Sequence, residues 1–297
     1  MMQETDFSIK LFIGEDCSTD GTREICQHYK SRYPEKIELI LREKNLGANA
    51  NSPEIYEKCF SYGSYTAMCE GDDYWTDKTK LQKQIDFLEA NPDFAICFHP
   101  VKAVYEDGVK DSYLSNLDQK EITTFEDLAL GNYIHTPSCV FRNGLFGKFP
   151  DWVYQSPVGD WVLHLLNAQY GKIKFLKDTM AIYRIHDGGA WSTEKNISKY
   201  QKWIEVVESC RKHFAPRSAE NFSRGETTSY IFLCFFCFDE GKYTDYRKYY
   251  YKCLKRIKYI GIRNLLTLTI RYFLSYMPFV AAYYYKAREN TRSAGQV

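Results

Sequence analysis

The sequence predicts an α/β fold, in which a mostly parallel sheet carries helices on both faces, followed by a helical C-terminal region. Short apolar runs alternate with amphipathic segments over the first two thirds of the 297 residues, as in strands joined by crossover helices. From about residue 195 onward the apolar positions follow helical spacing. We therefore expect two domains, residues 1–195 and residues 196–297.

The expected elements are bounded by residues that begin or end regular structure. Gly14 ends the first strand, and Ser18, Thr19 and Asp20 are N-cap candidates for the helix after it. We expect strands at residues 7–13, 36–41, 94–98, 101–105, 136–141, 172–176 and 180–185, and a short strand directly before Glu70. We expect helices at residues 23–33, 52–60, 78–90, 124–130 and 159–170, and a loop at residues 107–118.

The short strand before Glu70 ends in three carboxylates within four residues, those of Glu70, Asp72 and Asp73. Carboxylates this close repel one another, and a divalent cation offsets the repulsion best. Mg²⁺ typically uses one or two protein carboxylates, and substrate phosphates and waters complete its shell. Ligands of open α/β sheets bind at the carboxyl ends of strands, where this cluster falls. The alternative is an ordinary acidic turn, because Gly-Asp-Asp is common turn chemistry.

Charge and composition limit the class of protein. The formal net charge is +1, so we expect no nucleic-acid partner. The ten cysteines follow no repeated spacing, and Cys234 and Cys237 lie in an apolar run, which favours core packing over a zinc or redox site. Reduced thiols indicate a cytoplasmic protein. We find no signal-peptide pattern and no apolar run of membrane-spanning length.

Five short stretches occur in a characteristic order over roughly residues 7–192. They are Ile13-Gly14-Glu15-Asp16-Cys17-Ser18-Thr19-Asp20-Gly21-Thr22, Asn45-Leu46-Gly47, Cys69-Glu70-Gly71-Asp72-Asp73-Tyr74-Trp75, Gly159-Asp160-Trp161 and Tyr183-Arg184-Ile185-His186. In this order they resemble the family 2 glycosyltransferases of the GT-A fold, a Rossmann-like fold, and particularly the bacterial enzymes of surface-polysaccharide assembly. The resemblance implies a nucleotide-sugar donor, a divalent cation (Mn²⁺ or Mg²⁺) and an inverting transfer.

On the donor side, the resemblance assigns Asp72 to the metal and four acids to the nucleotide sugar. A carboxylate at the end of the first strand can accept a hydrogen bond from a pyrimidine N–H, and the family uses the position of Asp16 for the base. Glu70 would belong to the ribose or metal shell, and Asp73 could serve either. The alternative for Glu15 and Asp16 is a helix-cap cluster. The four acids assigned to the nucleotide sugar are Glu15, Asp16, Glu70 and Asp73.

On the acceptor side, Asp160 is the candidate general base, placed at the start of a helix. It would take the proton of an acceptor hydroxyl that attacks the anomeric carbon through an oxocarbenium-like transition state. The alternative is that Asp160 only caps its helix, and Trp161 either packs or flanks the acceptor.

His186 matches the family's histidine near the metal, and the planar fork of Arg184 suits a phosphate. We expect the glycine-containing loop at residues 187–192 to cover the donor.

The family's first strand and the helix after it have no counterpart in this sequence. We therefore expect a misassigned start, a truncated copy, or another segment that fills the gap. A missing central strand would leave backbone groups unpaired, at a cost of about 1–3 kcal/mol for each buried group. An inactive glycosyltransferase remnant is thus one alternative function. A metal-dependent nucleotidyltransferase is another, although no Gly-rich, Lys-containing phosphate loop is present.

The C-terminal region is strongly basic. Residues 242–272 carry nine Lys and Arg residues and one Asp, so nine minus one gives a net charge of +8. Tyrosines interleave with these charges, and a mostly apolar run follows at residues 265–285. Basic, aromatic-rich helices tend to lie on anionic membrane surfaces, so we expect peripheral association with the inner face of the plasma membrane. The alternative is a helical pair that packs on the catalytic domain with its basic face in water.

These observations predict a cytoplasmic, peripheral-membrane, metal-dependent glycosyltransferase. It would move a sugar from a nucleoside-diphosphate sugar, with a UDP-sugar favoured, to a hydroxyl of a glycan acceptor. The family resemblance favours an acceptor carried on a polyprenyl diphosphate, used in cell-surface polysaccharide synthesis.

Overall fold

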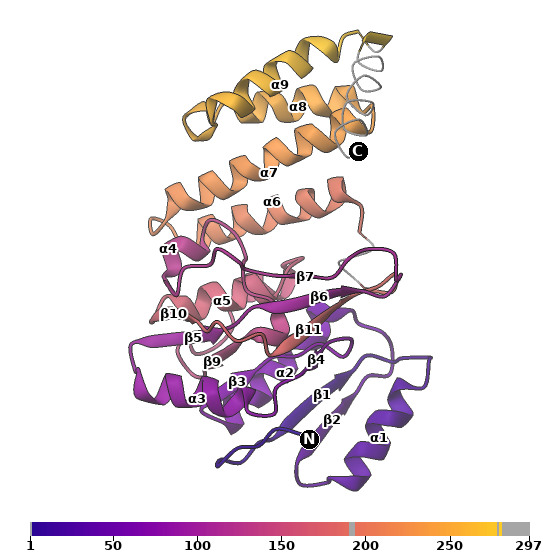
Figure 1. Cartoon of the computed structure of the whole chain (residues 1–297), viewed down its shortest axis with the longest axis vertical. Coiled ribbons are helices and arrows are strands. Elements are labelled where there is room, and N and C mark those ends of the chain that lie inside the picture. Colours follow the sequence, from indigo (N-terminus) through magenta and orange to yellow (C-terminus); the bar gives the residue numbers. More distant parts are fainter. Residues whose placement is uncertain (1, 190–193, 278, 281–297) are drawn as a thin grey trace. The chain divides into compact units, whose positions relative to one another are not determined.

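The computed structural model describes residues 2–189, 194–277 and 279–280 (Figure 1). The chain divides into two compact units, Met1–Ser192 and Thr193–Val297. Residues 190–192 of the expected covering loop lie outside the described residues, as do residues 278 and 281–285 of the expected apolar run.

The described strands all belong to the first unit. They are β1 (Leu11–Glu15), β2 (Ile37–Leu41), β3 (Tyr65–Ala67), β4 (Tyr74–Trp75), β5 (Phe94–Phe98), β6 (Val101–Tyr105), β7 (Tyr113–Leu114), β8 (Ile122–Thr123), β9 (Val140–Arg142), β10 (Lys172–Phe175) and β11 (Ala181–Ile185). Strands β1 and β2 form a two-stranded sheet. A five-stranded sheet has the order β3-β9-β5-β10-β8, and a four-stranded sheet has the order β4-β11-β6-β7.

The sheets are mixed rather than mostly parallel. Among the described strand pairs, β1–β2, β5–β10 and β6–β11 run parallel, and the other five run antiparallel. Most antiparallel pairs involve strands of two or three residues, which are too short for a periodic pattern to reveal. The α/β class with a C-terminal helical region is confirmed, and the expectation of a mostly parallel sheet is corrected.

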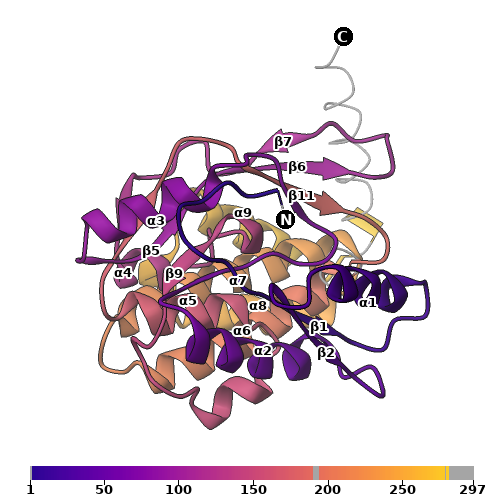
Figure 2. The ribbon, with the colours of Figure 1, turned by 90° about the horizontal axis from the view of Figure 1, so that it is seen from below.

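Helices cover the five-stranded sheet. All five residues of β5 are buried, which requires cover on both faces, and Figure 1 shows α3 and α5 on opposite sides of this strand. Helix α1 lies beside β1 and β2 (Figure 2). The helices and 3₁₀ turns of this unit are α1 (Thr22–Arg32), α2 (Ala48–Tyr62), α3 (Lys80–Ala90), α4 (Phe125–Leu128), η1 (Thr136–Ser138), η2 (Asp151–Gln155) and α5 (Asp160–Ala168).

Several local expectations differ from the structure. The loop expected at residues 107–118 contains the short strand β7. The first strand, expected at residues 7–13, is β1, which begins four residues later and ends two residues later than expected. The strand expected at residues 136–141 begins only at β9, because Pro137 lacks an N–H and starts the 3₁₀ turn η1 instead. Gly21, at φ 89°, is the N-cap of α1, and Asp20 accepts the Thr22 N–H at 3.1 Å rather than capping from its expected position.

Helix α2 packs against both β1 and β3, which belong to different sheets. The Asn51 side-chain amide donates to the Gly14 carbonyl at 3.0 Å. A Cβ at Gly14 would lie 2.1 Å from Ile55 Cδ1 and 3.0 Å from Asn51 Nδ2, so the close approach requires glycine. The contact fixes α2 against the carboxyl end of β1.

The second unit is helical throughout its described residues. Its core gathers apolar and aromatic side chains from successive helices, and includes Cys234 and Cys237, as the packing interpretation predicts. The Tyr246 hydroxyl, fully buried, donates to the Leu268 carbonyl at 2.5 Å. The helices are α6 (Asn196–His213), α7 (Ala219–Asp239), α8 (Tyr243–Leu254), the 3₁₀ turn η3 (Ile257–Tyr259) and α9 (Ile262–Leu274). None of the helices within the described ranges combines the length and apolarity that crossing a bilayer requires.

Candidate active site

Three carboxylates gather on the turn between β3 and β4. Glu70, Asp72 and Asp73 each offer one oxygen, and these oxygens lie within 4.8 Å of one another. The Asp73 N–H donates to the Glu70 carbonyl at 3.1 Å, which closes the turn. Because β3 belongs to the five-stranded sheet and β4 to the four-stranded sheet, this acidic turn also joins the two sheets.

Burial and neighbouring carboxylates raise the pKa values of Glu70 and Asp73 in the acidic turn. Burial, and then the carboxylates of Asp160, Asp73 and Asp72, raise the pKa of Glu70 to about 8. Glu70 as a residue is solvent-exposed, so bulk water offsets part of this effect. Burial also raises the pKa of Asp73 to about 6, although a hydrogen bond from Arg184 opposes the shift. The turn therefore holds more negative charge than the protein around it neutralises.

Only one of the two carboxylate oxygens of Asp73 has a hydrogen-bond partner among the described residues. Its Oδ1 accepts the Arg184 backbone N–H at 2.9 Å. Its Oδ2 is buried and has no hydrogen-bond partner within the part of the chain that the structure describes. An unsatisfied buried acceptor is costly, and a cation would satisfy it. Three clustered carboxylates are the donor set of a hard ion, so the residues fit Mg²⁺ or Mn²⁺.

His186 follows β11 and lies against this turn. Its Nε2 is 3.0 Å from Asp72 Oδ2, so the structure brings together two residues that are 114 positions apart. Ligands at adjacent corners of an octahedral shell, each about 2.1 Å from the ion, are about 3.0 Å apart. The Gly188 N–H also points to His186 Nδ1 at 3.2 Å, which places the imidazole proton on Nε2. Ligation through Nε2 would require that proton to move to Nδ1, so the role of His186 as a metal ligand stays a prediction.

The Arg184 side chain is engaged elsewhere in this structure. Its Nε donates to Glu106 Oε1 at 2.7 Å, and the guanidinium forms an ion pair with the same carboxylate. Only the backbone N–H of Arg184 reaches the acidic turn. Phosphate binding by this guanidinium would require it to leave Glu106, and it stays a prediction.

Asp160 is held in place at the first position of α5. Its Oδ1 accepts the Trp161 N–H at 2.7 Å, and its Oδ2 accepts a side-chain N–H of Asn132 at 2.9 Å. Burial raises the pKa of Asp160, which favours a proton acceptor at neutral pH. Because Asp160 contributes to the raised pKa of Glu70, its carboxylate lies within electrostatic reach of the acidic turn. Trp161 is fully buried and its indole N–H donates to the Leu128 carbonyl at 3.0 Å, so Trp161 packs.

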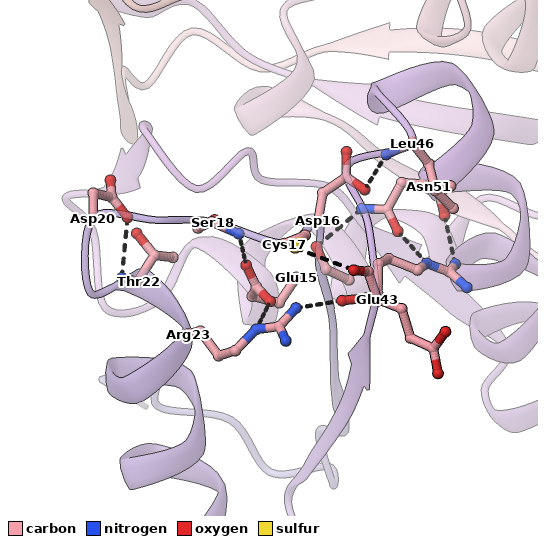
Figure 3. Close-up of polar contacts among 12 residues, drawn as sticks. Glu15, Asp16, Cys17, Ser18, Asp20, Thr22, Arg23, Glu43, Leu46 and Asn51 are labelled. Carbon is pink, nitrogen blue, oxygen red and sulfur yellow. Dashed lines mark hydrogen bonds and ion pairs between the residues drawn. The ribbon is translucent and has the colours of Figure 1, made fainter.

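Glu15 belongs to a separate network at the end of β1 (Figure 3). It is 3 % exposed, accepts the Ser18 N–H and pairs with Arg23, whose guanidinium also donates to the Arg42 carbonyl. Burial alone would raise the pKa of Glu15, but the bonds from Ser18 and Arg23 outweigh it and hold the pKa below its ordinary value. Both oxygens of Glu15 therefore support the loop after β1, and its contact with a nucleotide stays a prediction.

Asp16 explains the presence of the Asn45-Leu46-Gly47 stretch. The N–H groups of Leu46 and Gly47 donate to the two oxygens of Asp16, each at 2.8 Å. Figure 3 shows the bond from Leu46. Gly47 has φ 78°, a conformation that favours glycine. A carboxylate can accept more than two hydrogen bonds, so Asp16 keeps capacity for a base N–H. The side chains of this stretch do not reveal its role, because the donors are backbone groups.

Sequence reasoning also missed side chains beside the acids. Burial and the charges of Asp160 and Glu70 raise the pKa of Tyr56, which lies on α2. Burial and the acidic turn raise the pKa of Tyr183, whose ring contacts that of His135 with centroids 5.5 Å apart. Tyr183 occurs in a stretch that the sequence singled out, whereas Tyr56 reads as one more apolar position of its helix.

A family model described as glycosyl transferase family 2 matches residues 2–151, about half of the chain. The match includes the β1 network and the acidic turn. Asp160, Arg184 and His186 lie beyond it.

Several bacterial proteins are similar to this chain. An uncharacterized Mycobacterium tuberculosis protein is 41 % identical over 190 residues, which cover 64 % of this chain and 54 % of that protein, so the chain spans about half of its length. TuaG of Bacillus subtilis, named for teichuronic acid biosynthesis, is 27 % identical over 210 residues (69 % and 78 % covered). The dTDP-rhamnosyl transferase RfbG of Shigella flexneri is 30 % identical over 223 residues (70 % and 74 % covered). By the family match and by this similarity, the chain belongs to glycosyl transferase family 2.

Proposed function

We propose that this chain transfers a sugar from a nucleoside-diphosphate sugar to a hydroxyl group of a glycan acceptor, with inversion at the anomeric carbon. One observation carries the proposal: three carboxylate oxygens lie within 4.8 Å of one another, and the buried Asp73 Oδ2 beside them has no partner among the described residues. Such a cluster is stable when a divalent cation and the diphosphate of a donor complete it.

The acidic turn would hold the cation through Asp72 and Asp73, with Glu70 in the metal shell or on the donor ribose. His186 would join as a ligand once its proton moves to Nδ1 and the Gly188 contact opens. A bound Mn²⁺ or Mg²⁺ would neutralise the charge that develops on the departing nucleoside diphosphate.

Asp160 is the proposed general base. As the acceptor oxygen bonds to the anomeric carbon, the hydroxyl proton passes to the carboxylate of Asp160, and the bond from the anomeric carbon to the diphosphate oxygen breaks on the opposite face. The donors from Asn132 and Trp161 keep the carboxylate in one orientation for this transfer. The nearby negative charge of the acidic turn favours the protonated product of Asp160.

Asp16 is the proposed contact for the nucleotide base. Uracil and thymine present the same imide N–H, which a carboxylate can accept. The name of RfbG, a dTDP-rhamnosyl transferase, supports a pyrimidine donor of this kind. A UDP- or dTDP-sugar therefore fits the site better than a GDP-sugar does.

The proposed acceptor is a cell-surface glycan. The name of TuaG, which refers to teichuronic acid biosynthesis, supports this class of acceptor. A glycan carried on a polyprenyl diphosphate is the form we favour, since it would be presented at the inner face of the plasma membrane.

Calorimetric titration of UDP, dTDP and GDP tests the donor site, with and without Mn²⁺. We expect UDP or dTDP to bind only with Mn²⁺, and Asp72→Asn to abolish this binding. The matched control is Asp178→Asn, which removes an exposed carboxylate whose ion pair is with Lys83. A folded wild-type chain that binds none of the three nucleotides would contradict the proposal and favour an inactive remnant.

Product analysis tests the reaction itself. Incubation with a donor sugar and an acceptor glycan is expected to release a nucleoside diphosphate. Release of pyrophosphate would instead identify a nucleotidyltransferase.

A further inference from the structure

Helix α9 is apolar on its outward side. Leu268 and Arg271 are buried, whereas four apolar residues are largely exposed. At 100° per residue, these four fall within a sector of about 80°, opposite to Leu268 and Arg271. They are Ile262, Leu266, Ile270 and Phe273, at 79, 59, 54 and 62 % exposure. We call them the α9 stripe; a surface helix normally presents polar residues on this side.

Two further apolar side chains are exposed in the residues that follow the helix. Met277 is 48 % exposed and Phe279 is 93 % exposed. Scattered apolar residues on a surface need no explanation, but a continuous run of this kind marks an interaction site.

Basic residues without an ion pair in the described part of the chain accompany the stripe. Lys248, Lys252 and Lys255 follow the exposed side of α8 at helical spacing, and Lys258 and Arg263 lie on η3 and α9. None of these five forms an ion pair within the residues that the structure describes. Asp245 is the single acidic residue between positions 242 and 272. The positive charge of this surface is therefore available to an external partner.

Tyrosine hydroxyls connect the two helices. Tyr251 OH lies 2.6 Å from Tyr272 OH, which in turn lies 3.0 Å from Tyr276 OH. Tyr251 is itself exposed on α8, between Lys248 and Lys255 in the helical spacing. Apolar residues, tyrosine hydroxyls and lysines thus occur side by side on the α8–α9 pair.

We propose that the exposed side of α8 and α9 docks on an anionic lipid bilayer, with the α9 stripe in the interface. Lysines are depleted from the cores of protein–protein interfaces, whereas a bilayer surface offers apolar chains, a polar zone that tyrosine prefers and anionic headgroups together. The 13 residues of α9 extend about 20 Å, too short to span but long enough to lie along the surface. The proposal does not depend on the glycosyl transfer proposed above.

Vesicle co-sedimentation tests the proposal. We expect the chain to pellet with vesicles of equal parts phosphatidylcholine and phosphatidylglycerol, and far less with pure phosphatidylcholine or at high salt. The triple variant Leu266→Ser, Ile270→Ser, Phe273→Ser should lose at least tenfold in partitioning, because it removes the apolar side chains that enter the interface. The double variant Lys252→Gln, Lys255→Gln should weaken binding by about fivefold for each lysine.

Controls separate docking from a folding defect. All five substituted side chains are exposed, so the thermal melting of both variants should match the wild type. The matched control Ile25→Ser, Tyr29→Ser removes an exposed apolar pair from α1, at 59 and 45 % exposure, and should leave sedimentation unchanged. Equal binding to neutral vesicles, or full binding by the triple variant, would overturn the proposal. A wild-type dimer by light scattering that the triple variant converts to a monomer, without vesicle binding, would also overturn it and assign the stripe to a second copy of the chain.

Discussion

Acidic residues occur at or just after the ends of two strands of the first unit, β1 and β3, and their surroundings differ. After β1, the oxygens of Glu15 and Asp16 meet backbone N–H groups and the guanidinium of Arg23. After β3, the carboxylates of Glu70, Asp72 and Asp73 cluster together, and the partners that the protein supplies to them among the described residues are the Arg184 N–H and His186. The pKa values agree with this difference. The pKa of Glu15 lies below its ordinary value, whereas the pKa of Glu70 is raised to about 8.

The difference teaches how to distinguish structural acids from ligand-binding acids. Both sites consist of neighbouring acids that follow a strand, so the presence of clustered acids alone does not distinguish them. The number of donors that the fold supplies separates them. The β1 network supplies its own donors and holds loops together, whereas the acidic turn leaves its charge for a ligand. Substitutions at Asp160, Glu15 and Glu70 test this contrast.

The largest effect is expected at Asp160, whose carboxylate adds to the charge of the acidic turn. Asp160→Asn keeps the size of the side chain but cannot accept the acceptor proton, so kcat should fall by about 10²–10⁴-fold. Binding of the nucleotide with Mn²⁺ should change little, because the acidic turn is intact. Steady-state transfer rates and nucleotide titration measure the two effects. Near wild-type transfer by this variant would show that Asp160 is not the base.

A large loss of stability is expected at Glu15. Glu15→Gln removes the charge that Arg23 and the Ser18 N–H engage, and breaking a buried pair costs several kcal/mol. Because the Arg23 side chain is 27 % exposed, we expect a loss of about 2–3 kcal/mol in the free energy of unfolding. Urea denaturation measures it. The control Glu54→Gln breaks an ion pair of Arg42 with a half-exposed partner and should cost less than about 1 kcal/mol. Equal losses in both variants would remove the contrast that we draw.

A smaller effect of opposite sign is expected at Glu70. Without metal, Glu70→Gln should raise the free energy of unfolding at neutral pH by about 1 kcal/mol, a value discounted for the exposure of this residue. The folded-state pKa of Glu70, about 8, lies above its ordinary value of 4.5. The stability that the wild type owes to this group is therefore fully present below pH 4.5 and is lost as the pH rises through 8.

Unfolding at a series of pH values, with and without Mn²⁺, measures this effect. The variant should lack the decline between these pH values, and Mn²⁺ should abolish the decline in the wild type. Destabilisation of the metal-free chain by Glu70→Gln would show that the acidic turn is supported by the protein after all.

Local sequence patterns predicted an element correctly where the residues of that element alone determine its structure. The runs at β5 and β6 are apolar and bounded by loop residues, and both were predicted with their observed bounds. The strand predicted at residues 136–141 begins too early, because Pro137 lies in a 3₁₀ turn that precedes β9. The direction of strand pairing could not be predicted from local patterns, because β9 pairs with β3 and β5 through contacts between residues far apart in the sequence.

The site was predictable to the extent that its side chains carry the chemistry. The acidic turn and the contact between Asp72 and His186 follow from residues that the sequence singles out. The backbone donors of Leu46 and Gly47 carry no such signal. The pairing of Arg184 with Glu106 also gives no local signal, because it joins β11 to the residue that follows β6, the neighbouring strand in the sheet.

A metal ion bound at the acidic turn would affect the stability of the fold as well as the reaction. The turn links the five-stranded sheet to the four-stranded sheet, and Asp72 meets a histidine 114 positions further along the chain. An ion shared by these residues would act as a reversible cross-link that closes a very long loop. The conformational freedom that such a closure removes from the unfolded chain grows with loop length. Donor release followed by loss of the ion would then loosen the junction of the two sheets as well as empty the site.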